Sequence, residues 1–424
     1  MSSQSKNPTE QTTGFWVLFT LSTIPLIMVL GNSMLIPILP TIQSELNISQ
    51  FQVSLLITLF SVPAGIIIPL AGILSDRLGR KTIIAPSLLL YGAGGLITGL
   101  AAVWGGGVYW LMITGRIIQG IGAAGTAPIA MALVSDLYHK NERSKALGII
   151  EASNGMGKVL SPILGSLIAL ITWYALFFTF PALCLPIALA VWFIIQEPEK
   201  EEQAQPLSQY RDHLMKTWKR QGRWLSVAFA AGAITLFIMF GVLFYLSDLL
   251  EKRYGVDGVI KGLILAVPLL AMSSTSFWVG SYVQQRMRLM KKLLVIGLFS
   301  IATGMGLVPF FSNIYVLLAL LVGIGVGSGL ILPCLNTMIT SAVGPQERGI
   351  VTSLYGSVRF IGVALGPPIF GALAGMKIWL FLGNATLALL IGVLAIFLIR
   401  QPERLRGKGG QSRLLIRRNG LRPT

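Results

Sequence analysis

The sequence predicts an all-α integral membrane protein whose twelve transmembrane helices form two related six-helix bundles. The first observation is composition: 54% of the 424 residues are hydrophobic and only 12% are charged, which is not typical of a soluble chain. The second is that apolar stretches of roughly 20 residues, the length that crosses a bilayer, recur from end to end. The third is that features of the first half recur in the second half at one constant spacing.

Each apolar stretch is a candidate membrane span. In order, the twelve stretches cover residues 14–40, 50–72, 82–103, 108–133, 145–169, 173–195, 224–247, 261–283, 291–311, 314–341, 349–374 and 377–399. No positively charged segment with a cleavage site precedes the first stretch, so we expect no signal peptide.

An internal duplication is indicated by three features that recur 205 residues later. These are Pro128 and Pro333, Pro162 and Pro367, and the pairs Glu142-Arg143 and Glu347-Arg348. Because six spans is an even number, both repeats have the same orientation, and a pseudo-twofold axis relates them. The predicted units are an N-terminal bundle over residues 1–195, a cytoplasmic central loop over 196–223, a C-terminal bundle over 224–399 and a basic cytoplasmic tail over 400–424.

The net charge of +17 is distributed unevenly over the chain. Of the 33 Lys and Arg residues, 26 fall in the two tails and the even-numbered loops. The others are Lys252, Arg253, Lys261 and Lys377 in odd-numbered loops and Arg116, Lys158 and Arg359 within spans. This bias predicts a multi-pass protein of the cell membrane with both termini in the cytoplasm. The basic tail is expected at the lipid headgroups, and binding of nucleic acid is the less favoured interpretation.

The loop between spans 2 and 3 reads GILSDRLGRK, from Gly72 to Lys81. Glycine permits a tight turn there, Asp76 can meet the positive N-terminal end of a neighbouring helix, and Arg80 can pair with an acid such as Asp136 at the end of span 4. The loop resembles the signature loop of the major facilitator superfamily. That resemblance implies a gate, to which we assign Gly72, Asp76, Arg77, Gly79, Arg80, Lys81 and Asp136. The alternative is an ordinary basic cytoplasmic loop.

Two further segments extend the resemblance. LMITGRIIQGIGAAGTAP in span 4, with Arg116, Gln119 and Gly120, is similar to a motif of the same superfamily. Its Gly120-x-Gly122-x-x-Gly125 pattern also matches a dinucleotide-binding loop, but the preceding strand that such a loop requires is absent from the predicted elements.

GIIEASNGMGKVLSPILG in span 5 resembles the motif of the superfamily's antiporters. The matching positions are Gly148, Gly157, Pro162 and Gly165, while Ser161 and Ser166 replace two glycines. Because serine is small, we expect close packing against span 8 to survive. The resemblance implies a twelve-span exporter that exchanges its substrate for protons.

Charged residues inside the spans are the candidates for chemistry, since a charge at the bilayer centre costs roughly 2.5–3.5 kcal/mol on insertion scales. Glu151 and Lys158 are seven residues apart and therefore share one helix face, with Asn154 between them. Arg359 matches Asn154 at the 205-residue spacing, so we expect it to approach Glu151. Burial favours the protonated form of a carboxyl group, whereas nearby bases favour the ionised form. The alternatives are a structural ion pair and, for the cations, snorkelling toward a helix end.

We assign proton coupling to Glu151 and Arg116. The predicted substrate cavity comprises Lys158, Arg359, Asn154, Gln119 and Asn32. Three bases against one acid favour a substrate with negative charge or acceptor oxygens. Asn32 occupies a position where several drug exporters of the resembled type carry an acid, which argues against a purely cationic substrate.

The sequence therefore predicts a monomeric, proton-coupled exporter of an amphiphilic small molecule, a drug or a metabolite, that works by rocking two bundles around a central site. Uptake, transport of a lipid-like molecule and a non-transporting membrane protein are the alternatives. No catalytic residue, cofactor or metal site is expected: the two cysteines, Cys184 and Cys334, fall within spans, and no nucleophile motif or metal-ligand cluster is present.

Overall fold

The computed structural model describes residues 14–104, 109–138, 140–197, 207–283, 286–343 and 345–399. Over these residues the chain forms helices and no strand. In chain order the elements are α2 (Phe15–Ser33), η1 (Ile36–Ile38), α3 (Leu39–Glu45), α4 (Gln50–Leu78), α5 (Arg80–Trp104), α6 (Tyr109–Ala124), α7 (Ala127–Leu137), α8 (Lys140–Ala169), α9 (Ala175–Ile194), α10 (Leu207–Tyr254), α11 (Gly258–Tyr282), α12 (Met287–Leu307), η2 (Val308–Phe310), α13 (Ile314–Ala342), α14 (Pro345–Ala372), η3 (Ala374–Met376) and α15 (Lys377–Leu398). The predicted tail 400–424 lies outside the described residues.

The all-α membrane fold predicted from the sequence is confirmed. Within the described part of the chain, eleven helical stretches are long and apolar enough to cross a membrane. The predicted fifth span is the remaining one: α8 has 30 residues and packs between α2 and α11. Its charged and polar residues, Glu151 and Lys158 among them, make it less apolar than the others.

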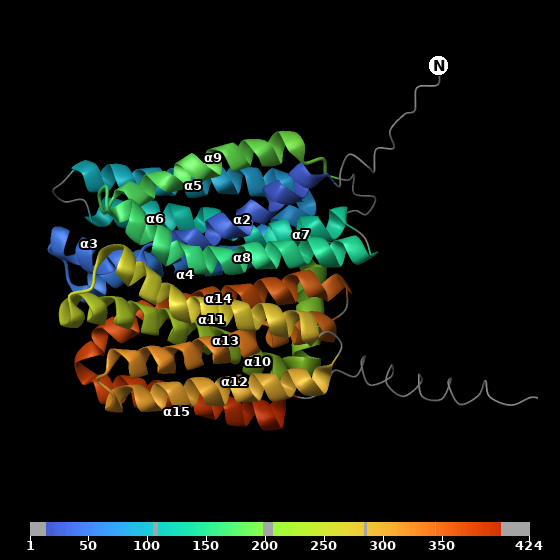
Figure 1. The fold of residues 1–424 in the computed structure, drawn as a ribbon. Helices are drawn as coiled ribbons and strands as arrows, with labels where there is room; N and C mark the ends of the chain where they lie inside the picture. Colours follow the sequence, from blue (N-terminus) through green and yellow to red (C-terminus); the bar gives the residue numbers. More distant parts are fainter. Residues whose placement is uncertain are drawn as a thin grey trace, which may run out of the picture.

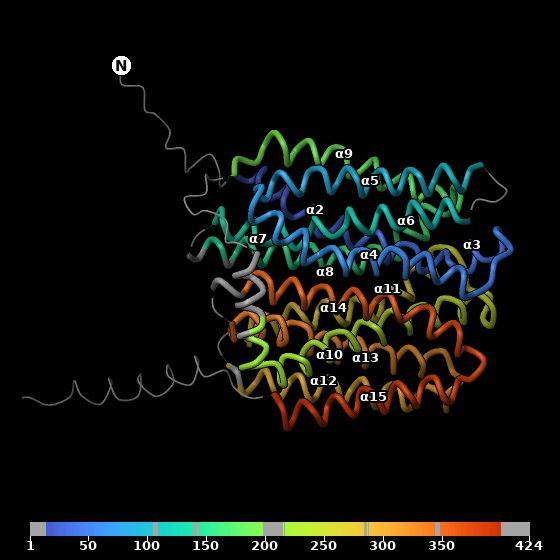
Figure 2. Tube along the Cα trace, turned by 180° about the vertical axis from the view of Figure 1, so that it is seen from behind, coloured from blue at the N-terminus to red at the C-terminus, as the bar shows by residue number. Residues whose placement is uncertain are grey.

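The two halves of the chain lie on opposite sides of the molecule. In Figure 1, α2 to α9 occupy the upper part and α10 to α15 the lower part. The halves meet where α4 packs against α14 and where α8 packs against α11. Helix α2 begins and helix α15 ends at the same end of the bundle (Figure 2). We call this the termini end, and the other the opposite end.

A closed ring of helices surrounds the centre of the molecule. Helix α2 packs against α8, α8 against α11, α11 against α13, α13 against α10, α10 against α14, α14 against α4 and α4 against α6. Helix α7, which follows α6 after a break at Gly125 and Thr126, completes the ring by packing against α2. Helices α5, α9, α12 and α15 lie outside this ring (Figure 1). The ring helices are therefore the ones that can present side chains to a central site.

The predicted central loop, residues 196–223, is helical in part. Helix α10 begins at Leu207 and runs for 48 residues, so its first turns precede the predicted seventh span. Residues 207–221 are polar but contain neither glycine nor proline, and most of them are compatible with a helix. The polarity of residues 207–221 predicted a loop. Their helix propensity instead allows α10 to begin before the apolar part of the seventh span.

Motif glycines of α8 pack against α2 and the turn that follows it. A Cβ added at Gly165 would lie 2.1 Å from the carbonyl oxygen of Met34, and one at Gly157 would lie 3.2 Å from that of Leu26. Within α8, the Ser161 hydroxyl donates to the carbonyl oxygen of Gly157. These positions therefore hold α8 against the first span.

The predicted close packing of this segment against span 8 involves other residues. A Cβ at Gly262 of α11 would lie 2.5 Å from both the Pro162 oxygen and the Ser166 hydroxyl oxygen of α8. Gly148, in contrast, has no neighbouring atom within 4 Å of an added Cβ. The second half of the motif thus packs against two neighbouring helices, α2 and α11, whereas Gly148 packs against neither of them.

Hydroxyl groups join the two halves by donating hydrogen bonds to backbone carbonyl oxygens. The pairs are Thr58 to Ala364, Ser357 to Gly65, Ser273 to Gly155 and Ser247 to Ile36. All four acceptors are main-chain groups of helices or of η1. The boundary is therefore formed by small residues and short polar contacts.

Replacing Gly165 by Ala should destabilise the protein, and replacing Gly148 by Ala should not. The added methyl group at Gly165 must displace the Met34 backbone, and overpacking of this kind costs about 1–3 kcal/mol. At Gly148 the methyl group enters open space, and alanine is the better helix former. Thermal unfolding of the purified variants in detergent measures the difference. Equal melting temperatures would show that close contact with Met34 does not constrain the fold.

Candidate functional site

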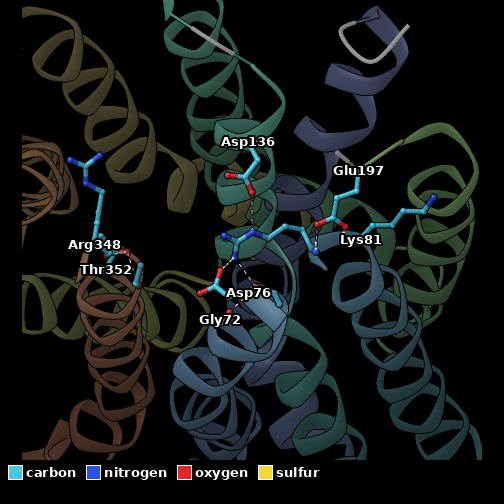
Figure 3. Close-up of polar contacts among 10 residues, drawn as sticks. Gly72, Asp76, Lys81, Asp136, Glu197, Arg348 and Thr352 are labelled. Carbon is cyan, nitrogen blue, oxygen red and sulfur yellow. Dashed lines mark hydrogen bonds and ion pairs between the residues drawn. The ribbon is translucent and has the colours of Figure 1, made fainter. Parts of the chain in front are cut away.

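At the termini end, polar side chains from α4, α5 and α7 gather around Arg80, the first residue of α5. Figure 3 labels Asp76, Asp136 and Glu197 of this group. Arg80 Nη1 lies 2.6 Å from Asp76 Oδ1, one turn earlier in the chain, and donates to the Ser75 hydroxyl at 2.9 Å. Its Nε lies 3.2 Å from Asp136 Oδ2 at the end of α7. The Arg80–Asp136 pair predicted from the sequence is therefore present. One guanidinium joins the ends of three helices.

Glu197 is a member of this cluster that the loop motif does not contain. It follows α9, and its two carboxylate oxygens accept hydrogen bonds from the backbone N–H groups of Arg80 at 2.6 Å and Lys81 at 3.0 Å. The first amides of a helix have no partner within the helix and favour a negative charge. Lys81 Nζ in turn donates to the Ile195 carbonyl oxygen at 2.9 Å. An acid directly after the sixth predicted span was the sequence signal that could have identified Glu197.

Two glycines of the loop allow close approach of this cluster to its neighbours. Gly79 has φ +101°, a conformation that glycine adopts without strain, and a Cβ there would lie 3.0 Å from Glu197 Oε2. A Cβ at Gly72 would lie 3.0 Å from the Ser353 hydroxyl oxygen of α14, in the other half. Arg77 is exposed in the last turn of α4. The loop thus adjoins both the end of α9 and the second half of the chain.

A cleft of about 130 Å³ lies beside Asp76 between α4, α7 and α14. Asp76 and Arg80 contribute its charged side chains. Its lining on α14 consists of Gly349, Ile350, Thr352, Ser353 and Gly356. Figure 3 shows Thr352 on α14, next to Arg348. The ionic cluster therefore borders the boundary between the two halves, where movement of one half against the other would alter it.

A second group of predicted residues lies inside the first half, around Arg116. This side chain is fully buried, and its guanidinium donates to the Leu56 carbonyl oxygen at 2.8 Å, to Gln119 Oε1 at 2.6 Å and to Asn32 Oδ1 at 2.8 Å. The Phe60 ring centre lies 4.5 Å from its Cζ. All of these partners are neutral. They replace the water that a buried cation loses, and they join α2, α4 and α6.

Asn32 and Gln119, which the sequence assigns to a substrate cavity, are buried in this structure and are hydrogen-bond partners of Arg116. Asn32 also donates to the Ser61 hydroxyl at 2.7 Å. Among the described residues, Arg116 contacts no carboxylate. The sequence does not reveal that the polar face of α6 is turned toward α2 and α4.

The inner face of α8 carries Glu151, Asn154 and Lys158. Exposed apolar residues mark the outer face of this helix: Ile149, Met156, Leu160 and Leu167. Gly157 marks the side that packs against α2, and Gly155 the side that packs against α11. At about 100° per residue, the three polar positions project between those two neighbours, toward the interior of the ring. The same-face prediction for Glu151 and Lys158 thus agrees with the packing.

Arg359 on α14 joins this group from the other half of the chain. The charges of both Glu151 and Arg359 act on the half-buried Lys158. Within the described chain, none of these three side chains forms a hydrogen bond or an ion pair, so the expected approach of Arg359 to Glu151 is not a direct contact. Glu151 and Arg359 thus each lie within electrostatic range of Lys158.

Spare hydrogen-bonding capacity lies beside Arg359. Its Cζ is 5.4 Å from the centre of the Tyr355 ring. Its Nε and the Tyr355 hydroxyl are both buried and lack a hydrogen-bond partner in the part of the chain that the structure describes. A buried polar group without a partner costs about 1–3 kcal/mol. A ligand that presents acceptor oxygens here would satisfy such groups. For metals, the described residues contain no cluster of three or more His, Cys, Asp or Glu side chains.

Comparison with known proteins connects this architecture to a family. The Major Facilitator Superfamily model matches residues 21–311 and 287–422. The bacillibactin exporter of Bacillus subtilis (strain 168) is 42% identical over 384 residues, which cover 90% of this chain and 95% of that protein. Multidrug resistance protein 1 of the same organism is 25% identical over 393 residues, covering 89% and 94%. In fold, the chain is similar to a D-xylose–proton symporter, with a TM-score of 0.74, 15% identity and coverage of 92% and 98%.

Replacing Glu197 by Ala should expose the start of α5. Without the carboxylate, the amides of Arg80 and Lys81 lose their acceptors and should exchange hydrogen with solvent faster, by roughly 10-fold for a loss of about 1.5 kcal/mol per charged hydrogen bond. Hydrogen–deuterium exchange of a peptide that spans residues 79–86 measures this. Glu45→Ala, at an exposed position at the opposite end, is the matched control. Unchanged exchange in Glu197→Ala would show that the capping contact does not hold this helix end.

Proposed function

The chain belongs to the Major Facilitator Superfamily and is a transporter rather than an enzyme, and we propose that it is a proton-coupled exporter of an amphiphilic, negatively charged small molecule. Its central site is formed by Glu151, Lys158, Asn154 and Arg359. The two halves alternate between arrangements open to one side of the membrane or the other. The relatives that share most of its length are exporters and efflux proteins.

The observation that carries this proposal is the unpaired charge group on the inner faces of α8 and α14. Lys158 is half-buried and has no hydrogen-bond or ion-pair partner among the described residues. Arg359 likewise has a buried Nε without an acceptor within the described ranges. A structural ion pair would place these cations against the acid, whereas here they remain available to a ligand. Because two cations face one acid, the site favours a ligand with negative charge.

The first substrate to test is bacillibactin, because the relative with 42% identity is named an exporter of that compound. A broader range of anionic amphiphiles is the natural extension, since other relatives are named multidrug resistance proteins. Asp76, Arg80, Asp136 and the cleft beside them would form the gate at the termini end, since they border the boundary between the halves.

We place the termini end in the cytoplasm, because Lys and Arg are concentrated in the loops predicted on that side. Export then moves substrate from the termini end to the opposite end. A cysteine introduced at Asp257, in the turn before α11, should react with a membrane-impermeant reagent added to intact cells. Protection of that cysteine in intact cells and labelling only after lysis would reverse the orientation.

Transport by everted membrane vesicles tests the function directly. With an inside-acid gradient, vesicles that contain the protein should accumulate bacillibactin and dissipate the proton gradient as they do so. A panel of anionic, neutral and cationic amphiphiles of similar size would define the class. Substrate accumulation that does not respond to the gradient would contradict proton coupling, and accumulation of cations alone would contradict the proposed polarity.

Replacing Glu151 by Gln should abolish accumulation driven by a pH gradient while substrate binding is kept. Glutamine has the shape of the protonated acid but cannot release a proton, and it leaves the cations of the site in place. Binding should also depend less on pH than in the unaltered protein. Gradient-driven uptake and equilibrium binding are measured on the same vesicles, with Glu45→Gln as the control. Full gradient-driven transport in Glu151→Gln would show that this residue does not carry the proton.

Replacing Lys158 by Met should weaken binding of anionic compounds more than binding of neutral ones. A hydrogen bond to a charged group contributes about 1.5–3 kcal/mol, so the loss for an anion should be roughly 10-fold or more. Lys145→Met provides the control, because Lys145 is an exposed lysine near the start of the same helix. Binding constants for a matched anion and neutral amphiphile decide the matter. Weaker binding of cations instead would reverse the inferred charge of the substrate.

A further inference from the structure

A groove of about 390 Å³ lies at the termini end between the first turns of α10 and the middle of α14. Its lining consists of Met215, Trp218 and Lys219 on α10 and Leu354 on α14. The Met215 and Trp218 side chains are 49% and 43% exposed. The groove is therefore an open, mostly apolar channel with one cation at its margin, and it is separate from the site of Lys158 and from the cleft beside Asp76.

The charge at this groove is positive and uncompensated by its lining. Lys219 is exposed and forms no hydrogen bond or ion pair with any described residue. Arg220 and Arg223 follow on the same helix and are also exposed. Of the residues that the structure describes, no acid contributes to the lining. A ligand that complements this surface carries an apolar chain and an anionic head.

The position of the groove identifies where such a ligand comes from. The stretch of α10 that is apolar enough to cross a membrane begins at Thr217, so Met215, Trp218 and Lys219 lie at its edge. The first turns of α10 lie at the termini end of the second half (Figure 2). Tryptophan and lysine at such a boundary are typical of contact with lipid headgroups. The surrounding bilayer supplies anionic amphiphiles at this depth.

A chain of aromatic contacts connects the groove to the central site. The Trp218 ring centre lies 6.0 Å from that of Phe229, and Phe229 lies 5.6 Å from Tyr355. Tyr355 in turn lies under Arg359 at 5.4 Å. Phe229 and Tyr355 are buried. Trp218, which lines the groove, is thus the first of three packed aromatic rings, and the last of them, Tyr355, contacts Arg359 of the central site.

We propose that one anionic phospholipid of the bilayer occupies this groove, with an acyl chain against Met215, Trp218 and Leu354 and its phosphate on Lys219. The bound lipid holds Trp218 against Phe229 and so steadies the aromatic stack beneath Arg359. The first statement concerns binding and is independent of transport. The second, that the lipid affects activity, rests on the function proposed above.

Native mass spectrometry of the full chain in detergent tests the binding. Phosphatidylglycerol should bind more tightly than phosphatidylcholine with the same acyl chains. Lys219→Gln should weaken phosphatidylglycerol binding about fivefold, the effect expected of one lysine at an anionic surface. Lys292→Gln removes an exposed lysine of α12 and should have no effect. Equal affinity for the two lipids, or equal loss in the two variants, would overturn the proposed headgroup contact.

Tryptophan quenching by lipids with brominated acyl chains tests the position of the chain. Brominated phosphatidylglycerol, at low ratio to protein, should quench a component of the fluorescence that is missing in Trp218→Phe. Trp278→Phe is the control, because Trp278 is 72% exposed on α11. Brominated phosphatidylglycerol and brominated phosphatidylcholine should quench Trp278 equally. If Trp218→Phe retains the phosphatidylglycerol-specific quenching, the acyl chain does not lie in this groove.

Proteoliposomes with and without phosphatidylglycerol test the connection to activity. The lipid should stimulate gradient-driven transport by the unaltered protein and by Lys292→Gln, and not by Lys219→Gln. Equal stimulation of all three, with binding still specific to Lys219, would overturn the effect on the central site and leave the lipid site intact. A protein that does not transport at all would contradict the proposed function and leave the binding result unaffected.

Discussion

The free energy of holding charge inside an apolar bundle determines how this structure is arranged. The groups that surround the buried and half-buried cations differ from one cation to the next. Arg116 is surrounded by neutral acceptors and an aromatic ring within one half of the chain. Arg80, near the edge of the bundle, is paired with carboxylates. Among the described residues, Lys158 and Arg359 have neither a hydrogen-bond acceptor nor a paired carboxylate, and in the proposed function that difference separates structural cations from those available for binding.

The two polar regions at the boundary between the halves respond to the same motion. The Arg80 cluster lies beside the contact between α4 and α14, and Arg359 is on α14 as well. A displacement of α14 relative to α4 would therefore change the cleft at the termini end and the position of a cation in the centre. In the proposed function, helix α14 would provide the physical link that alternating access requires between the gate and the central site.

Much of the fold follows from patterns that are local in sequence. Hydropathy predicts the spans, and helical periodicity predicts that Glu151 and Lys158 share a face, because both depend on neighbouring residues only. The Arg80–Asp136 pair could be predicted from the sequence, because both residues lie next to the ends of predicted spans at the same membrane surface. Glu197 could not, since its partners are backbone amides that no residue type reveals. The contacts of Arg116 with Asn32 and Gln119 could not be predicted, because a polar residue within a span does not indicate which neighbour its helix face meets.

The hydroxyl-to-carbonyl contacts between the halves have a thermodynamic consequence. A hydrogen bond of this kind contributes about 0.5–1.5 kcal/mol net, so Thr58, Ser247, Ser273 and Ser357 together hold the halves with roughly 2–6 kcal/mol. Reversing a two-state population from 1:99 to 99:1 takes about 5.5 kcal/mol of differential ligand affinity. The polar part of the seam is thus of the same order as the free energy that ligand binding can supply. The packing of α4 on α14 and of α8 on α11 adds an apolar contribution to the same boundary.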